Sequence, residues 1–240
     1  PSFTVNEVNV FDESCFQRGD GSIVLNVSGG EPAFLWSSGD TTQVIDSLSA
    51  GEYSVTITDP FCTLVLEDIA VDSPDSLSLS NITVQPAGCA LSSDGSITVA
   101  AAGGNSPYLY QWEGGNTSNA LPNLTGGTYG LTISDVKSCS RVYSFEVPAP
   151  DPLAAVLDSV KPVSCFGQSD GALYARAQGG TGPYSWSWSN GGVLPTIDGL
   201  LFGAYQATIT DQNGCQAISP FYPVPQPTVL TQSLSVIPPS

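Results

Sequence analysis

One segment recurs three times in this chain at a constant spacing. LSAGEYSVTITD begins at Leu48, LTGGTYGLTISD at Leu124 and LLFGAYQATITD at Leu200, so both offsets are 76 residues. Three tryptophans keep the same offset, namely Trp36, Trp112 and Trp188. Internal repetition is the signature of a tandem array in which each repeat is one structural unit. The sequence therefore predicts three similar domains within its 240 residues.

Short proline-containing segments mark the predicted boundaries between the repeats. We place repeat 1 at residues 1–74, repeat 2 at 75–150 and repeat 3 at 151–227. Residues 228–240 parallel the beginning of repeat 3, so we expect the first strand of a fourth repeat there. Because proline restricts its own φ and the residue before it, such short joints favour semi-rigid, end-to-end connections. Strand geometry then predicts an advance of roughly 30–45 Å per repeat.

Apolar residues alternate with polar residues through much of each repeat. SIVLNV (22–27) and YSVTIT (53–58) show this two-residue period, and Gly-Gly, Asn-Gly and Asp-Gly pairs lie between such segments. About seven short strands per repeat predict an antiparallel sandwich. A tryptophan in the third strand and Leu-x-x-Gly-x-Tyr before the sixth, which resembles a tyrosine corner, favour the immunoglobulin-like type. The predicted fold class is all-β: three tandem immunoglobulin-like antiparallel β-sandwich domains.

Six cysteines follow the same register. We call Cys15, Cys89 and Cys165 the early cysteines and Cys62, Cys139 and Cys215 the late cysteines. One early and one late cysteine per repeat predict one disulfide within each repeat, joining Cys15–Cys62, Cys89–Cys139 and Cys165–Cys215. Each bridge is expected to join two loops at one pole of its sandwich. A link between repeats would contradict this register.

Composition excludes several classes of function. Lys and Arg total 5 against 22 Asp and Glu, which gives a net charge of −17. Nucleic acids and anionic membranes need a cationic surface, so neither is an expected partner. The absence of histidine removes the usual general base and the commonest transition-metal ligand. We therefore expect no enzyme, no catalytic residue, no cofactor-binding residue and no membrane insertion.

The third repeat carries the clearest family resemblance. CFGQSDGAL, GGTGPYSWSWSNGG and GLLFGAYQATITDQNGC resemble the SprB repeat of giant surface adhesins of gliding bacteria. Repeats 1 and 2 carry the same pattern, except that the Asn-Gly before the late cysteine is missing. The resemblance implies secretion by a type IX system, an extracellular location on the cell surface, and a role in adhesion or gliding. It brings no catalytic residues.

Two aspartates in each repeat are candidate calcium ligands. If the early and late cysteines of one repeat are bonded, the two aspartates of that repeat lie at the same pole. The three pairs are Asp20 with Asp59, Asp94 with Asp135, and Asp170 with Asp211. Calcium takes several oxygen ligands, and two carboxylates fall short of a full shell. The alternative is that each aspartate caps its own turn through side-chain-to-backbone hydrogen bonds. Calcium is the one cofactor that the sequence suggests.

The tripeptide Arg18-Gly19-Asp20 resembles the one that animal cell-surface receptors bind. Only its aspartate recurs in the register, because Ser92-Ser93 and Gln168-Ser169 replace the first two residues. Asp-Gly also recurs, as a turn before a strand requires. We therefore interpret Asp20 as a turn residue rather than a receptor ligand.

Further motifs suggest modification or sugar binding. Ser76 and Ser159, near the joints, lie in Asp-Ser sequences that resemble the O-glycan acceptor motif of such bacteria and are candidate glycosylation sites. Tyr184, Trp186 and Trp188 alternate and so face one way. Aromatic residues dominate sandwich cores, and we expect these three in the core rather than on a sugar-binding face.

The function that these features favour is a structural and adhesive repeat segment of a long secreted filament or adhesin, acting as a semi-rigid spacer. Its expected partners are neighbouring repeats of the same long chain, other copies in a filament, and a surface or glycan ligand whose identity the sequence leaves open. The alternative is a glycan-binding β-sandwich module, with calcium as an optional aid.

Overall fold

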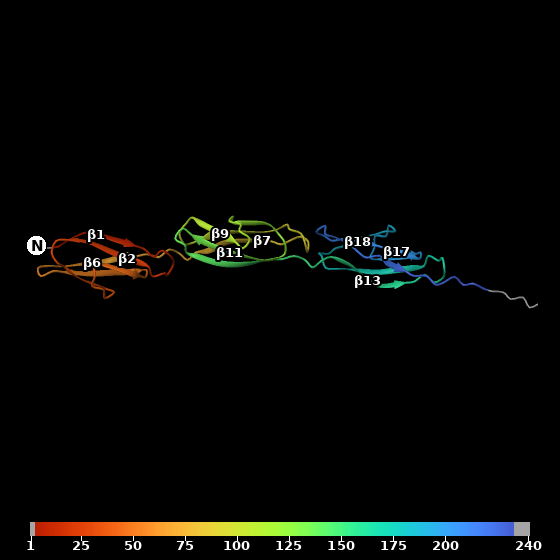
Figure 1. The fold of residues 1–240 in the computed structure, drawn as a ribbon, viewed down its shortest axis with the longest axis horizontal. Coiled ribbons are helices and arrows are strands. Elements are labelled where there is room, and N and C mark those ends of the chain that lie inside the picture. Colours follow the sequence, from red (N-terminus) through yellow and green to blue (C-terminus); the bar gives the residue numbers. More distant parts are fainter. Residues whose placement is uncertain (1–2, 233–240) are drawn as a thin grey trace, which may run out of the picture. The chain divides into compact units, whose positions relative to one another are not determined.

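The computed structural model describes residues 3–232 of the chain. Every regular element in this part of the chain is a β-strand (Figure 1). Within it, no helix has the length and apolar character needed to cross a membrane. The described residues form two compact units. One contains the residues up to 83 with 97–121 and 128–145, and the other contains 84–96, 122–127 and the residues from 146 onward.

Repeat 1 is a sandwich of two antiparallel three-stranded sheets. Its strands are β1 (Thr4–Phe11), β2 (Gly21–Ser28), β3 (Ala33–Trp36), β4 (Val44–Leu48), β5 (Gly51–Thr58) and β6 (Thr63–Val71). The strand orders are β1-β2-β4 and β3-β5-β6. First, second and fifth strands in one sheet, with third, sixth and seventh in the other, define the immunoglobulin-like sandwich once its fourth strand is omitted. The fold class is therefore as predicted.

One strand fewer forms in repeat 1 than the roughly seven that we expected. The missing one would lie between β3 and β4, where the chain makes a tight turn instead. Trp36 N donates to Asp40 O at 2.9 Å and Gly39 N donates to Trp36 O at 2.9 Å. Because the turn closes locally, its backbone groups are not available for a sheet edge.

Repeats 2 and 3 follow the same order of elements. In repeat 2, sheets β10-β8-β7 and β12-β11-β9 contain β7 (Ser78–Gln85), β8 (Gly95–Ala102), β9 (Tyr108–Trp112), β10 (Ala120–Leu124), β11 (Gly127–Asp135) and β12 (Ser140–Val147). In repeat 3, sheets β13-β14-β16, β15-β18-β19 and β17-β20 contain β13 (Ala154–Lys161), β14 (Gly171–Gln178), β15 (Ser185–Trp188), β16 (Thr196–Leu200), β17 (Gly203–Tyr205), β18 (Ala207–Thr210), β19 (Gln216–Ile218) and β20 (Tyr222–Val224). Pro220 lies between β19 and β20 and has no N–H to continue the ladder.

The predicted tryptophans are core residues. Trp36, Trp112 and Trp188 are 2%, 2% and 3% exposed. Each indole Nε1 donates to a carbonyl oxygen six residues later in the chain, at 2.8–2.9 Å. The buried polar atom of each ring is therefore satisfied, as burial of an indole requires.

Tyrosine corners form as the sequence predicts. The Tyr53 hydroxyl donates to Ser49 O at 2.8 Å, and the Tyr205 hydroxyl donates to Leu201 O at 3.0 Å. Both bonds tie the chain that crosses between the sheets to its own backbone, which fixes the start of β5 and of β17.

The two cysteines of repeat 1 lie at opposite poles of its sandwich. The loop that carries Cys15 is held to the end of β6, because Glu13 N donates to Asp72 O at 2.9 Å. Cys62 lies in the turn between β5 and β6, at the other end of both strands. The eight residues of β5 separate the two ends by about 26 Å. We call these ends the early-cysteine pole and the late-cysteine pole.

The disulfides predicted within each repeat are therefore wrong. The structure joins Cys15 to Cys139 and Cys89 to Cys215. Each bridge links the early cysteine of one repeat with the late cysteine of the next. A bridge within a repeat would need two Cα atoms less than 7 Å apart, and the sandwich holds them a strand length apart. In the described chain, Cys62 and Cys165 are free and exposed.

The end of the chain leaves one fold prediction open. Residues 228–232 form no strand, and residues 233–240 lie outside the described part of the chain, so the predicted strand of a fourth repeat stays a prediction. The predicted boundaries between the three domains are likewise untested.

Candidate functional site: the inter-repeat junctions

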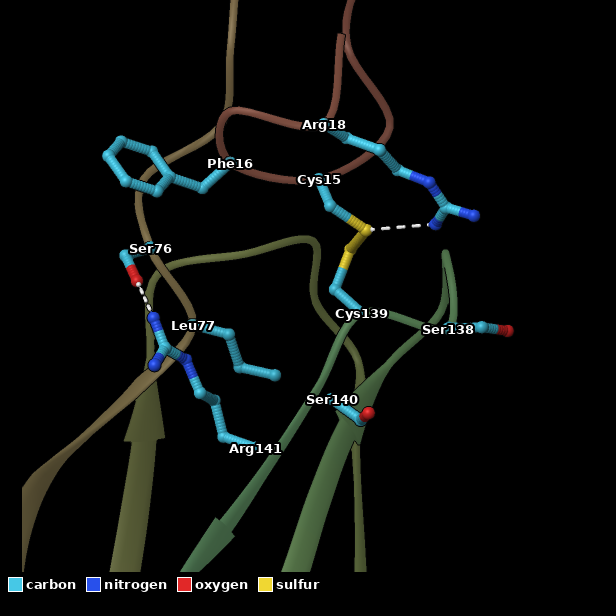
Figure 2. Close-up of a pocket in the computed structure, with 9 residues that line it drawn as sticks. All are labelled: Cys15, Phe16, Arg18, Ser76, Leu77, Ser138, Cys139, Ser140 and Arg141. Atoms are coloured by element: carbon cyan, nitrogen blue, oxygen red, sulfur yellow. Dashed lines mark hydrogen bonds between the residues drawn. A yellow bond between two sulfur atoms is a disulfide. The ribbon is translucent and has the colours of Figure 1, made fainter. Parts of the chain in front are cut away.

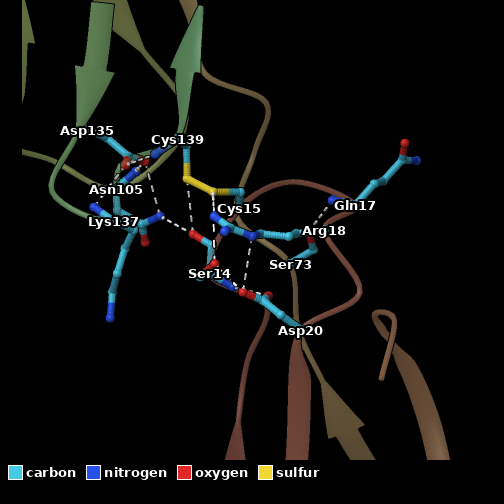
Figure 3. The surroundings of a disulfide bond; sticks show 10 residues. All are labelled: Ser14, Cys15, Gln17, Arg18, Asp20, Ser73, Asn105, Asp135, Lys137 and Cys139. Atoms are coloured by element: carbon cyan, nitrogen blue, oxygen red, sulfur yellow. Dashed lines mark hydrogen bonds and ion pairs between the residues drawn. A yellow bond between two sulfur atoms is a disulfide. The ribbon is translucent and has the colours of Figure 1, made fainter. Parts of the chain in front are cut away.

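The first junction joins the early-cysteine pole of repeat 1 to the late-cysteine pole of repeat 2. Its disulfide, Cys15–Cys139, has a Cα–Cα distance of 5.7 Å. Beside it, Asn105 Nδ2 donates to Ser14 O at 2.9 Å (Figure 3). The covalent bond is thus accompanied by a direct hydrogen bond between the two repeats.

A buried carboxylate organises the repeat 2 side of this junction. Asp135 is 3% exposed, and its Oδ1 accepts from Lys137 N at 2.9 Å and from Cys139 N at 3.0 Å. Its Oδ2 accepts from Asn105 N at 2.8 Å and from Asn105 Nδ2 at 3.3 Å. Asp135 therefore shapes the turn that presents Cys139 and also orients the amide that reaches repeat 1 (Figure 3).

A second aspartate organises the repeat 1 side. Asp20 accepts from both the backbone N, at 2.8 Å, and the hydroxyl of Ser14. Arg18 Nη1 donates to Cys15 Sγ at 3.3 Å, and Arg18 Nε lies 3.5 Å from Asp20 Oδ2 (Figures 2 and 3). Arg18 thus contacts both Asp20 and the bridge, and Asp20 has the predicted turn role.

The peptide joint is also fixed against repeat 2. Gly104 N donates to Asp75 O at 2.7 Å, and Arg141 Nη2 donates to Ser76 Oγ at 3.0 Å (Figure 2). Gly103 has φ +71°, and a Cβ there would meet Ser76 O at 2.2 Å, so only glycine permits this approach. A hollow of about 260 Å³ remains between the bridge and the joint.

The second junction repeats this construction. Cys89 bonds Cys215 with the same Cα–Cα distance, 5.7 Å. Asp211 is 6% exposed, and its carboxylate accepts from Asn213 N, Cys215 N and Thr181 N at 2.8–2.9 Å. Asn213 Nδ2 donates to Gly88 O at 2.8 Å, so the accepting carbonyl again precedes the early cysteine. Both junctions therefore combine one disulfide with one amide-to-carbonyl bond.

The predicted aspartate pairs are not brought together within a repeat. Asp20 lies at the early-cysteine pole of repeat 1 and Asp59 at its late-cysteine pole. Asp170 and Asp211 lie at the corresponding poles of repeat 3. Instead, hydrogen bonds run from Asp20 through Ser14 and Asn105 to Asp135 across the first junction (Figure 3). All six aspartates, including Asp94, accept backbone N–H groups.

This pattern matches the turn-cap alternative. In the described residues, no three acidic or cysteine side chains are placed to share a metal ion. Calcium binding by the six aspartates stays a prediction.

Comparison with protein families agrees with the repeat pattern. The model of the SprB repeat matches residues 8–41, 81–117 and 157–193. The chain contains three SprB repeats. Each match begins in the first strand and ends beyond the core tryptophan. It therefore covers the early-cysteine half of each SprB repeat, whereas the resemblance seen in the sequence also includes the late-cysteine half. SprB repeats are modules of cell-surface adhesins.

The chain is also similar to some solved structures, at low sequence identity. No curated protein matches the chain in sequence. Three N-terminal domains of the bacteriophage RB49 highly immunogenic outer capsid protein share 12% identity over 93% of this chain and 96% of that chain, with a TM-score of 0.42. The C-terminal 282-residue fragment of intimin, solved with the intimin-binding domain of its translocated receptor, shares 14% identity over 67% and 68% of the two chains, with a TM-score of 0.37.

Several junction residues of the SprB repeats were not predicted from the sequence. Asn105 and Asn213 occupy different turns, and the residues aligned with Asn105 are Glu31 and Thr181. Because the register does not repeat the amide, repetition alone does not reveal it. Arg141 likewise has no repeated counterpart. One available signal was Asn213 itself, because Asn-Gly just before a late cysteine places an amide beside the sulfur.

The candidate modification and sugar-binding residues have different surroundings. Ser159 is exposed on β13, whereas Ser76 is half-buried and its hydroxyl accepts from Arg141. Glycosylation at both stays a prediction. Trp186 and Trp188 are buried as expected, with ring centroids 6.1 Å apart. Tyr184 was expected with them but is 38% exposed, because it precedes β15 and its hydroxyl donates to Gly179 O.

The thermal stability of the SprB junctions should fall at acid pH. Burial alone would raise the pKa of Asp135 and of Asp211, but the backbone N–H groups that each carboxylate accepts outweigh it and lower both pKa values below 3.8. A lowered folded pKa contributes stability above the unfolded pKa, and this stability is lost as pH falls through the folded pKa. We expect thermal melts to be flat above about pH 5 and to fall below about pH 4. Asp135→Asn with Asp211→Asn should flatten that fall, and an unchanged acid limb would contradict the assignment.

A buried glutamate should weaken the early-cysteine pole of repeat 1. Glu13 is 4% exposed, and its Oε1 accepts from Gly19 N at 2.6 Å, but Oε2 has no partner among the described residues. The residues aligned with it, Ala87 and Val163, are apolar and 3% exposed. We expect Glu13→Val to raise the unfolding free energy of repeat 1 by about 1–2 kcal/mol, because an unsatisfied buried polar atom is removed. Chemical denaturation measures it. Glu13→Gln is the control and should not stabilise, and a loss of stability in Glu13→Val would refute the prediction.

Proposed function

We propose that this chain is a structural and adhesive segment of a long secreted cell-surface filament, in which the SprB repeats act as a semi-rigid spacer. The observation that supports it best is the double connection at each junction. A peptide joint and a disulfide both link repeat 1 to repeat 2, and the same holds for repeats 2 and 3. Two connections at separate points resist hinge motion that one short joint would allow.

The remaining features agree with a spacer. The anchoring residues, Asp135 and Asp211, are engaged by backbone N–H groups rather than left open to a ligand. The net charge of −17 on 240 residues favours solubility at high local density. Location on the surface of gliding bacteria, export by a type IX system and attachment during gliding complete the proposal.

Removal of one repeat in register tests the spacer role. Deletion of residues 75–150 brings Cys15 into register with Cys215, so the junction can still close. Cells that produce the deleted protein should carry filaments shorter by roughly 30–45 Å, from strand geometry, and should still attach. A matched control replaces Cys15, Cys89, Cys139 and Cys215 by serine at full length. Loss of attachment in the deletion, with filament length unchanged, would overturn the spacer proposal.

Glycan binding stays the alternative prediction. A glycan array probed with the oxidised chain, with and without a calcium chelator, separates the two functions. The spacer proposal expects no glycan bound in either condition. Binding that Tyr184→Ala abolishes would favour the alternative.

A further inference from the structure

Two SprB repeats end in poles that have the junction geometry but no bridge. The late-cysteine pole of repeat 1 carries Cys62, and the early-cysteine pole of repeat 3 carries Cys165. Both thiols are exposed, whereas the four bridged cysteines are half-buried.

The turn at Cys62 matches the turns of the bridged late cysteines. Asp59 Oδ1 accepts from Phe61 N and Cys62 N at 2.7 Å, as Asp135 accepts from Lys137 N and Cys139 N. Asp59 N donates to Cys62 O at 3.0 Å, and the equivalent bonds close the turns of Cys139 and Cys215 at the same distance. The turn is one residue shorter but keeps these three hydrogen bonds.

The turn at Cys165 likewise matches the bridged early cysteines. Asp170 Oδ1 accepts from Ser164 N at 2.9 Å. The equivalent bonds, from Ser14 N to Asp20 Oδ1 and from Gly88 N to Asp94 Oδ1, are 2.8 Å and 2.9 Å long. Gln168 N donates to Cys165 O at 3.1 Å, as Arg18 N does to Cys15 O. The turn thus has its bridged conformation without a bridge, so bond formation requires no rearrangement.

Two features set the Cys62 pole apart from the bridged late-cysteine poles. Asp59 Oδ2 is buried and has no hydrogen-bond partner among the described residues, whereas the equivalent atoms of Asp135 and Asp211 accept backbone N–H groups of their own repeats, from Asn105 and Thr181. Beside it is an open hollow of about 470 Å³, lined by Gly30, Glu31, Asp59, Pro60 and Phe61. Phe61 is 77% exposed. At the first junction, the equivalent positions 104 and 105 contact the joint and the early-cysteine turn of the preceding repeat.

We propose that Cys62 and Cys165 are the open halves of inter-repeat disulfides, each completed by the complementary pole of another SprB repeat. Cys62 takes an early cysteine and Cys165 takes a late cysteine. A second copy of this chain presents both poles, so copies should join head to tail through Cys62–Cys165 bonds. The proposal goes beyond the spacer function, because it concerns how one segment is covalently linked to the next.

The chemistry needs a disulfide oxidant, for which glutathione disulfide serves. One thiolate attacks glutathione disulfide and releases one glutathione thiolate, and the second protein thiol displaces the other glutathione from the mixed disulfide. Two protein thiols are thereby oxidised to one disulfide, and glutathione disulfide is reduced to two glutathione molecules that carry the protons. Desolvation raises the pKa of the Cys62 thiol, and the hydrogen bond and negative charge of Asp59 raise it further. The reaction is therefore run near pH 8.5, close to the ordinary thiol pKa.

Mixing two variants of the full 240-residue chain tests the pairing. Cys62→Ser keeps only the Cys165 thiol, and Cys165→Ser keeps only the Cys62 thiol. With glutathione disulfide, the mixture should form a dimer joined by Cys62–Cys165, identified by non-reducing peptide mapping. We expect this dimer to exceed either homodimer about tenfold, which corresponds to about 1.4 kcal/mol of favourable contact between the poles. The unmutated chain should form a ladder of oligomers.

Further outcomes decide against the proposal. Homodimers as abundant as the mixed dimer would show that any two exposed thiols react. Monomers that carry glutathione on Cys62 and Cys165 would show that the poles do not meet. Asp59→Ala in the Cys165→Ser chain distorts only the turn at Cys62, and it should reduce the mixed dimer while leaving Cys15–Cys139 and Cys89–Cys215 intact.

Discussion

Pulled from its two ends until every repeat is unfolded, the oxidised chain should extend to about 300 Å, whereas the reduced chain should reach about 800 Å. The difference follows from the order of the bridges along the chain. Cys89 lies between Cys15 and Cys139, and Cys139 lies between Cys89 and Cys215, so the bridges interlock. Force then passes through residues 1–15, 89–139 and 215–240 alone, about 90 residues at roughly 3.4 Å each. Single-molecule force spectroscopy measures both lengths.

Matched variants make this measurement specific to the pairing. Cys15→Ser with Cys139→Ser leaves one bridge, and the extended path lengthens to about 115 residues, or about 390 Å. Cys89→Ser with Cys215→Ser should give nearly the same length. If the disulfides instead closed within each repeat, the first variant would keep only Cys165–Cys215 and would extend to about 650 Å. Replacement of Cys62 and Cys165 by serine should change nothing, and a large effect there would contradict the pairing.

The sandwich itself could be predicted from the sequence because its signals are local or repeated. Alternation in β2 and β5 follows from one buried face per strand, and Trp36 recurs because each core needs the same volume filled. The tyrosine corner of Tyr53 is a contact with a residue four positions earlier, so a short motif contains it whole.

The pairing of the cysteines could not be predicted in the same way. Repetition shows that Cys15 and Cys62 belong to one register but not at which pole each one lies. The answer depends on the direction of β5, which carries the chain from the pole of Cys15 to the pole of Cys62. In a tandem array an early cysteine faces the next repeat, so both pairings satisfy the same sequence period. The prediction that Asp20 and Asp59 lie at the same pole was wrong for the same reason, because it assumed a bond between Cys15 and Cys62.

Junction contacts such as Asn105 to Ser14 are harder still to predict. The two amides that cross the junctions, Asn105 and Asn213, come from different turns yet reach equivalent carbonyls. The acceptor is a backbone carbonyl, so the residue type at that position does not reveal it. Because the donor amide comes from a different turn in each junction, no repeated sequence position marks it.

Reduction should destabilise repeat 2 more than either neighbour. Repeat 2 supplies Cys139 to one bridge and Cys89 to the other, whereas repeats 1 and 3 supply one bridged cysteine each. When a repeat unfolds between folded neighbours, each bridge closes a loop of about 60 residues in its unfolded chain, which is worth about 4 kcal/mol in the chain-entropy model. Repeat 2 should therefore lose about 8 kcal/mol on reduction, and repeats 1 and 3 about 4 kcal/mol each. Because domains are commonly stable by only 5–15 kcal/mol, repeat 2 is expected to open first.

Hydrogen exchange resolves this prediction by repeat, through peptides that cover β2, β8 and β14 in a Cys62→Ser and Cys165→Ser background. Exchange in β8 should accelerate most on reduction, since a loss of about 4 kcal/mol already raises the open population about a thousandfold. Cys15→Ser with Cys139→Ser should expose β2 and β8 and spare β14, while Cys89→Ser with Cys215→Ser should expose β8 and β14 and spare β2. Bridges within each repeat would instead give equal losses of exchange protection in β2, β8 and β14 on reduction. That result would contradict both the pairing and the argument that the central repeat is held from its two sides.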